Sequence, residues 1–176
     1  MIENMPFCYN IKKAKAIVLG ADPGNFSDHG KAVEIKVAFG IVSGDPRYFD
    51  AILKNLESIG LSLNDVYVQN LITIHPGLET DSNPEWEKLA DVYLLDRIQE
   101  FKKLDPNIPV LVTAETIFRF LVNEKLPKAE LLYSDHRYHP VAPAENKLVR
   151  SLYPFFRHHN YSLDQHLEYR DRLKNL

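Results

Sequence analysis

The chain has 176 residues, 45% of them hydrophobic, which is the size and composition of one globular domain. The formal net charge is −3, so DNA binding would need a local basic face rather than an overall positive charge. Cys8 is the only cysteine, which excludes an internal disulfide and a cysteine-held iron–sulfur cluster. We expect one domain over residues 1–176, a monomer without a membrane span and, since no leader is evident, a cytoplasmic location.

The first half of the chain alternates strand-like and helix-like patterns. Ala16–Gly20 is an apolar run that stops at turn residues, which predicts a strand. A loosely alternating stretch covers residues 33–42. Asp45-Pro46 is typical of a helix start, and apolar residues at helical spacing follow it as far as Gly60. Val66–Asn70 predicts the next strand.

The second half continues the alternation before it becomes irregular. Asn83-Pro84 predicts the start of a second helix, and Val110–Thr113 predicts a third strand that leads into a short helix. Leu131–Ser134 predicts a fourth strand. Residues 136–143 are too polar and proline-rich for regular structure.

The end of the chain carries two further helix signals. A helix is expected from Ala144 until Pro154 breaks it. Ser162 and Gln165 have the spacing of a capping box, which predicts the start of a terminal helix.

This alternation predicts an α/β fold of three layers, α/β/α, with a four-stranded, mostly parallel central sheet. Sites in open parallel sheets gather at the carboxyl ends of the strands. The first, second and fourth expected strands are followed by Asp22, by Asn70, and by His136 or His139. We therefore expect these polar side chains to converge at one edge of the sheet.

The turn after the first strand is the first segment with chemical content. Gly20-Ala21-Asp22-Pro23-Gly24 delivers a carboxylate from a strand into a turn held by proline and glycine. A carboxylate fixed in this way suits a reaction whose transition state develops positive charge. Taken alone, the segment also fits an ordinary turn in which Asp22 bonds its own backbone.

Four segments, in this order, resemble motifs of the uracil-DNA glycosylase superfamily. The segment of residues 20–24 is similar to G-Q-D-P-Y of one branch and to G-M-N-P-G of the single-strand-selective branch. Phe26 and Val37-Ala38-Phe39-Gly40 resemble the later part of the pattern G-M-N-P-G-P-F…V-P-F-G. Val66–Asn70 resembles the strand whose final asparagine reads uracil. His139-Pro140 resembles the start of the closing H-P-S-P motif, and residues 143–147 are similar to the segment after that motif in the single-strand-selective branch.

The resemblance implies a monofunctional DNA glycosylase of base-excision repair, a hydrolase that acts on uracil or a related deaminated base in DNA. Because a duplex hides the N-glycosidic bond, the base is flipped into a pocket before the bond is cut. The partner is DNA that contains uracil or another damaged base, and no metal or organic cofactor is needed.

The resemblance also assigns roles to residues. Asp22 would position water or stabilise the oxocarbenium-like sugar, and His139 would stabilise the negative charge on the departing base, with His136 as the alternative histidine. Phe39 would stack on the base, and Asn70 would read its Watson–Crick edge. The remaining substrate-binding residues of the first motif would be Gly20, Ala21 and Gly24.

The sequence departs from the family pattern in three places. One is the functional histidine: His136 lies nearer the expected site when counted from the fourth strand, whereas the adjoining proline favours His139. Gly24 stands where one branch has a tyrosine that blocks thymine, so the pocket would be roomier. His139-Pro140 continues into Val141-Ala142 rather than serine and proline, which leaves the side chain that enters the DNA unassigned. Candidates for that role are Arg137, Tyr138 and Val141.

A basic stretch over residues 136–159 is the one local feature of charge that favours DNA. It holds four cationic side chains and four histidines against Glu145 alone; the cations are Arg137, Lys147, Arg150 and Arg157. The alternative interpretation is an ordinary solvated surface.

Three other interpretations remain open. The chain fits a superfamily member that has lost catalysis and binds nucleic acid or a free nucleobase. It also fits a nucleotide- or phosphate-binding α/β protein, although no Gly-rich phosphate motif is present and Asp22 would repel phosphate. Asp135, His136 and His139 are residue types that bind zinc, with His158, His159 and His166 as distant ligands, but no fixed metal-ligand pattern occurs.

Overall fold

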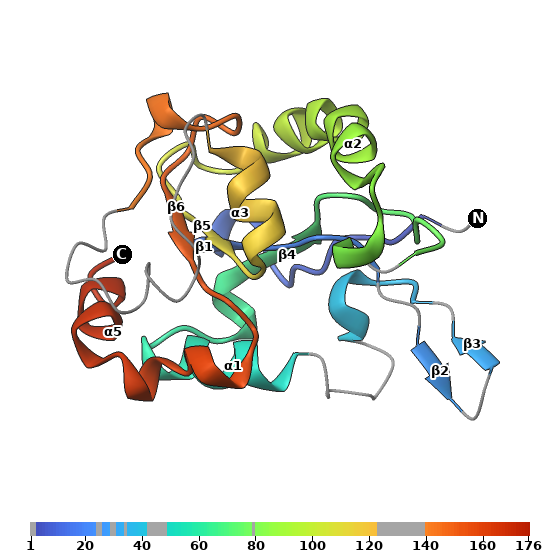
Figure 1. Cartoon of the computed structure of the whole chain (residues 1–176). Helices are drawn as coiled ribbons and strands as arrows, with labels where there is room; N and C mark the ends of the chain where they lie inside the picture. Colours follow the sequence, from blue (N-terminus) through green and yellow to red (C-terminus); the bar gives the residue numbers. More distant parts are fainter. Residues whose placement is uncertain are drawn as a thin grey trace.

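The computed structural model describes residues 3–23, 26–28, 31–33, 35–41, 49–78, 80–122 and 140–176. A four-stranded sheet in the order β4-β1-β5-β6 forms its centre, and all three strand pairings in it are parallel (Figure 1). The strands are β1 (Ala16–Gly20), β4 (Val66–Asn70), β5 (Val110–Val112) and β6 (Leu152–Pro154). The predicted α/β fold with a parallel central sheet is confirmed.

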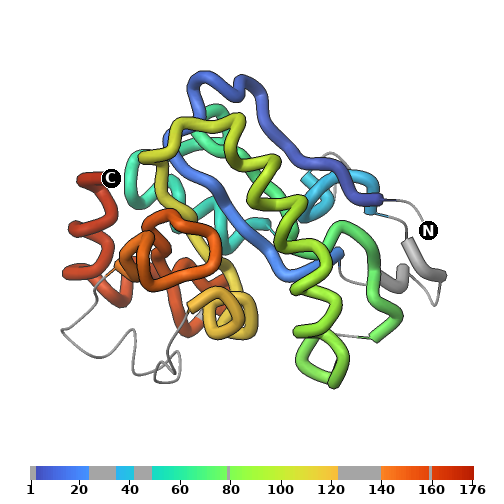
Figure 2. The backbone as a smooth tube through the Cα atoms, turned by 90° about the horizontal axis from the view of Figure 1, so that it is seen from above, coloured from blue at the N-terminus to red at the C-terminus, as the bar shows by residue number. Residues whose placement is uncertain are grey.

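Helices cover both faces of the sheet. On one face lie α2 (Trp86–Phe101) and α3 (Glu115–Leu121), and on the other lie α1 (Asp50–Ser58) and α5 (Leu167–Leu173) (Figure 1). Figure 2 views the molecule from above, with α2 on the side that faces the reader and α5 at the opposite end of the molecule from residues 3–5. No helix in the described ranges is both long and apolar enough to cross a membrane.

Short elements join these layers. An antiparallel hairpin pairs β2 (Phe26–Asp28) with β3 (Lys31–Val33). The 3-10 helices are η1 (Ile11–Lys13), η2 (Ala38–Gly40), η4 (Leu63–Asp65), η5 (Thr80–Ser82), η6 (Pro143–Glu145), η7 (His159–Tyr161) and η8 (Leu163–Gln165).

The two longest strands are buried along their whole length. All five residues of β1 and all five of β4 are buried, as expected for parallel strands with helices on both faces. Their register aligns Ala16 with Val66 and Gly20 with Asn70, so the two strands end side by side. This register places the end of the first motif next to Asn70.

The first residues of the described chain form an edge that the sequence did not predict. Phe7 and Val68 exchange two backbone hydrogen bonds of 2.9 and 2.8 Å, as in an antiparallel bridge along β4. Met5 forms a parallel bridge with Val37. Residues 4–7 therefore tie the edge strand β4 to the segment that leads into η2.

Two predicted helices are confirmed, one close to its expected last residue and the other close to its expected first residue. The helix before Gly60 ends as α1 at Ser58, and Gly60 adopts a positive φ of 80°, which a residue without a Cβ adopts at little cost. Its expected start at Asp45-Pro46 lies outside the described residues. The helix expected after Asn83-Pro84 begins two residues later at Trp86, and Asn83 Oδ1 accepts a 3.0 Å hydrogen bond from the Glu85 backbone.

The helix expected from Ala144 to Pro154 is wrong. The segment forms the short η6 and then an irregular loop, in which Asn146 Nδ2 donates to the carbonyl oxygens of Ala142 and Arg150 at 2.8 and 2.7 Å. These bonds fold the chain back on itself, and residues 152–154 then become β6, the fourth strand. Pro154 is tolerated because β6 is an edge strand of the sheet. The strand expected at Leu131–Ser134 lies outside the described residues.

The capping box expected at Ser162 is also wrong. Ser162 precedes η8, and its side chain makes no capping hydrogen bond. The terminal helix α5 begins later, at Leu167. The local signal marked the region correctly, but a 3-10 turn intervenes before the α-helix.

Arg150 caps the carboxyl end of α2 rather than facing solvent. Its guanidinium is buried and donates to four backbone carbonyls at 2.6–3.4 Å, those of Phe101, Leu104, Asp105 and Ile108. Burial lowers the pKa of Arg150, although a guanidinium keeps its charge at physiological pH. A cation at this position also complements the negative end of the helix dipole.

We predict that Arg150→Ala lowers the free energy of unfolding by roughly 3 kcal/mol, because buried carbonyls lose a charged donor. Urea denaturation followed by circular dichroism measures this loss. Arg157→Ala is the control, since Arg157 is exposed and its removal should change stability by less than about 0.5 kcal/mol. Equal effects of the two substitutions would contradict the capping role.

Candidate functional site

Three of the predicted site residues meet at the carboxyl ends of β1 and β4. Gly20 and Asn70 are neighbours in the strand register, and Phe39 of η2 packs over both. A Cβ added to Gly20 would overlap Asn70 Oδ1 and would lie 2.6 Å from Phe39 Cζ. Only glycine at position 20 therefore lets Phe39 and Asn70 come this close to the backbone of β1. The three residues form one contact although up to 50 positions separate them in the sequence.

Asn70 is held from two directions. It is 2% exposed, its Nδ2 donates to Asn4 Oδ1 at 3.2 Å, and its backbone N–H donates to Gln69 Oε1 at 2.8 Å. Its side chain points to the face of the sheet opposite α2, because residues alternate along a strand and Gln69 contacts α2. These two hydrogen bonds fix the amide.

Phe39 has a strained backbone. Its φ of 57° and ψ of 12° lie in the left-handed region, which costs a residue with a side chain about 1–2 kcal/mol. The ring is 8% exposed and makes an edge contact with Phe49 at a centroid distance of 5.5 Å. The strain turns the ring onto Gly20, so the space beside Asn70 is closed by the protein's own side chain.

Asp22 lies in the turn that follows β1, and its side chain contacts Thr80 and Trp86. Its Oδ2 accepts a hydrogen bond of 2.6 Å from Thr80 Oγ1 in η5 and one of 2.8 Å from Trp86 Nε1 at the start of α2. The carboxylate is half-buried and held by these two donors. These contacts join it to η5 and α2.

Ala21 continues the pairing beyond the end of the strand. Its carbonyl accepts a 2.9 Å hydrogen bond from the Ile72 backbone, and the Gly20 carbonyl accepts one of 2.8 Å from Leu71. Gly24, His136 and His139 lie outside the described residues, so the first motif is seen as far as Pro23.

The observed fourth strand carries a different histidine from those predicted. β6 is followed by Arg157 and His158, and the Arg157 backbone donates to the Thr113 carbonyl beyond the end of β5 at 3.1 Å. The exposed Arg157 and His158 therefore follow a strand at the same edge of the sheet as Gly20.

The basic stretch is only partly a surface feature. Arg150 is buried in its capping role, and Lys147 Nζ lies 3.3 Å from Asp91 Oδ1 and 3.7 Å from the centre of the Phe120 ring. Arg157 is exposed, whereas Arg137 lies outside the described residues. Of the four cations expected on a basic face, Arg150 is therefore buried in the interior.

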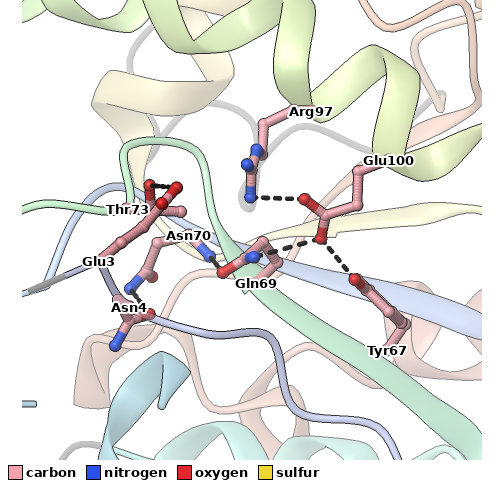
Figure 3. A network of polar contacts seen from close by, with 8 residues as sticks. All are labelled: Glu3, Asn4, Tyr67, Gln69, Asn70, Thr73, Arg97 and Glu100. Carbon is pink, nitrogen blue, oxygen red and sulfur yellow. Dashed lines mark hydrogen bonds and ion pairs between the residues drawn. The ribbon is translucent and has the colours of Figure 1, made fainter. Parts of the chain in front are cut away.

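A cavity of about 480 Å³ lies on the other face of β4, between α2 and the segment before Pro6. Figure 3 shows its polar network: Tyr67 Oη and Gln69 Nε2 donate to Glu100 Oε1, and Arg97 Nη1 lies 2.7 Å from Glu100 Oε2. Burial and the nearby Glu100 carboxylate raise the pKa of Tyr67, so Tyr67 remains a donor. The charged residues that line the cavity are Glu3, Asp96, Arg97, Glu100 and Lys103. More carboxylates than cations line this cavity, which disfavours an anionic ligand.

Sequence reasoning missed several residues around the first motif. His75 Nδ1 lies 3.0 Å from the Pro23 carbonyl oxygen, and Thr80 and Trp86 hold Asp22. His75-Pro76 is a histidine–proline pair five residues after the second strand, and this signal was available. Nothing in the sequence pointed to Asn4.

No group of three or more metal-binding side chains occurs within the described ranges. The residues considered for zinc at 135, 136 and 139 lie outside those ranges.

We predict that Gly20→Ala lowers the free energy of unfolding by about 1–3 kcal/mol, because the new methyl overlaps Asn70 and Phe39. Chemical denaturation of Gly20→Ala, of Asn70→Ala and of the double variant should show that the losses are not additive. Gly77→Ala is the control for backbone strain without a steric clash. Nothing lies within 4 Å of a Cβ at that position, so its cost of about 1–2 kcal/mol comes from the φ of 86° alone. Strict additivity at positions 20 and 70 would contradict the contact.

Comparison with known proteins adds no assignment to this site. No protein-family model matches the chain, and no curated protein matches it either. The residues that meet at the carboxyl edge of the sheet and the order of the four motifs are therefore the basis for a function.

Proposed function

We propose that the chain is a DNA glycosylase of the uracil-DNA glycosylase superfamily, which hydrolyses the N-glycosidic bond of uracil or a related deaminated base. The contact of Gly20, Phe39 and Asn70 is the observation that carries the proposal. These residues come from three of the four motifs that resemble the family, and an aromatic ring, a buried amide and a bare backbone are what a base-reading slot requires.

Each group has a task in this mechanism. A flipped base stacks on Phe39, and Asn70 bonds the Watson–Crick edge, while Gly20 leaves room for the ring of the base. Bond cleavage leaves positive charge on the sugar, which the Asp22 carboxylate stabilises. Asp22 lies two positions after Gly20, so their Cα atoms lie within about 7 Å, the span of one sugar beside its base. His139, or His136, would donate to the departing base.

Entry of a base requires Phe39 to move. The ring covers Gly20 in the present conformation, and the base must take that space. The positive φ of Phe39 stores about 1–2 kcal/mol, which offsets part of the cost of rearrangement. We expect the Phe39 ring to close this slot in the absence of substrate and to move aside for the flipped base.

Binding without catalysis is the second candidate function. The closed slot and the two hydrogen bonds that occupy Asp22 Oδ2 favour it, because a carboxylate already held by Thr80 and Trp86 has less freedom to stabilise a sugar cation. In this alternative the chain binds single-stranded DNA or a free base and leaves the glycosidic bond intact.

We predict that the purified protein releases uracil from a single-stranded oligonucleotide, with strand breaks after alkali as the readout. Asp22→Asn should lower the rate by about 10²–10³-fold, because it removes the charge that faces the sugar. Asn70→Ala should abolish the preference for uracil over cytosine. Intact strands at high protein concentration, together with measurable binding of the same oligonucleotide, would favour the non-catalytic alternative.

Two control variants separate chemistry from folding. Trp86→Phe removes one donor to Asp22 while keeping an aromatic ring in the core, so a moderate loss of rate with retained circular dichroism should follow. Lys88→Ala changes an exposed residue two positions further along α2 and should leave the rate unchanged. Equal losses in Asp22→Asn and Lys88→Ala would contradict the assigned role of the carboxylate.

A further inference from the structure

Asn70 and Asn4 form a chain of amide hydrogen bonds that ends on a backbone carbonyl. Asn4 Nδ2 donates to the Ile35 carbonyl oxygen at 3.0 Å, and Asn4 Oδ1 accepts from Asn70 Nδ2 at 3.2 Å. Figure 3 shows the side chains of Asn4 and Asn70 facing each other on the side of β4 away from Glu100. Asn4 and Asn70 are 1% and 2% exposed, so water does not replace these bonds.

The carbonyl at the end of this chain fixes the direction of both amides. A backbone carbonyl only accepts, so the Asn4 atom that faces Ile35 must be the NH₂ group. The other Asn4 atom is then the oxygen, which only accepts, and so the Asn70 atom that faces it must also be an NH₂ group. Asn70 Oδ1 is therefore the atom directed toward Gly20.

The backbone around Asn4 holds this arrangement in place. The Asn4 backbone N–H donates to the Thr73 carbonyl at 2.6 Å, and the next residue, Met5, bonds Lys36 and Ala38 at 2.8 Å each. Asn4 is thus anchored both to the end of β4 and to the segment that carries Phe39. A rotation of its amide would leave two buried polar groups unsatisfied, which costs more than the bonds themselves contribute.

Asn70 Oδ1 faces the one position of β1 that carries no side chain. A Cβ built on Gly20 would lie 2.2 Å from this oxygen, so the oxygen borders the space that the base takes in the proposed slot. An acceptor held there matches a ligand that brings a donor.

We propose that Asn4 is a positioning residue that sets base specificity by locking Asn70 with its oxygen toward the base; this inference rests on the proposed function. A locked acceptor selects bases with an N–H at the ring nitrogen of the Watson–Crick edge. Deamination creates this group, because it converts the bare ring nitrogen of cytosine or adenine into the N–H of uracil or hypoxanthine. The substrate class is therefore deaminated bases, and cytosine and adenine are rejected because two acceptors would face each other.

Two substitutions at one position separate orientation from folding. Asn4→Asp keeps an acceptor toward Asn70 and loses the donor to Ile35, whereas Asn4→Leu loses both. Both variants should be less stable than the parent protein. Only Asn4→Leu frees the Asn70 amide to rotate and to present its NH₂ group to a base.

The measurement is the ratio of release rates for uracil and cytosine, each at one position in otherwise identical single strands, at pH 8. We expect Asn4→Asp to keep the ratio within about threefold of the parent and Asn4→Leu to lower it about tenfold or more, the size of one lost neutral hydrogen bond. Thr73→Val is the matched control, because it removes the bond from Thr73 to Glu3 beside Asn4 without touching Asn70, and its ratio should not change. An unchanged ratio in Asn4→Leu, or equal losses in all three variants, would overturn the proposal.

A spectroscopic readout keeps this test separate from the test of catalysis. The side-chain NH₂ protons of Asn70 should be protected from solvent exchange in the parent and in Asn4→Asp, and unprotected in Asn4→Leu. If the parent cuts no DNA, the proposed function fails, and free uracil and free cytosine are then titrated into the ¹⁵N-labelled proteins. Selective shifts of the Asn70 amide with uracil, lost in Asn4→Leu, would support the inference. Equal or absent shifts with the two bases would overturn it.

Discussion

The missing side chain of Gly20 is the constraint on which the carboxyl edge of the sheet depends. β1 lies between β4 and β5, so its last residue is surrounded on both sides by backbone. Phe39 and Asn70 both fill the space that a Cβ would take. A single position without a side chain therefore lets an aromatic ring from η2 and an amide from β4 come together, and no other residue type would leave both in place.

The two faces of β4 have separate polar functions because side chains alternate along a strand. Tyr67 and Gln69 point toward α2 and bond Glu100, which ties the edge strand to the helix layer. Asn70 points to the opposite face, where Asn4 holds it. The short segment around residues 4–7 closes this edge, supplies backbone partners to β4, and carries the amide that orients Asn70. Stability and the proposed base recognition thus use different faces of the same strand.

The charges of the chain bear on how it would meet DNA. Arg150 is used inside the protein, and Lys147 is paired with Asp91 and packed on Phe120, so neither is a free cation for phosphate. Arg157 remains exposed at the edge of the sheet where Gly20 lies. With a net charge of −3, binding to DNA would rely on local groups of cations rather than on the overall charge of the protein.

The sequence by itself determined the elements whose signals are local: the apolar runs of β1, β4 and β5, the glycine after α1, the start of α2 near Asn83-Pro84, and the α/β layering that results from their order. It also singled out Gly20, Phe39 and Asn70, through motif order. Tertiary structure alone decided the rest, because those features depend on contacts between distant segments. Residues 152–154 became a strand instead of a helix since an edge of the sheet was open to them, and Arg150 was drawn inside by the carbonyls at the end of α2. Asn4 acquired a role only when strand pairing brought it to a residue 66 positions away.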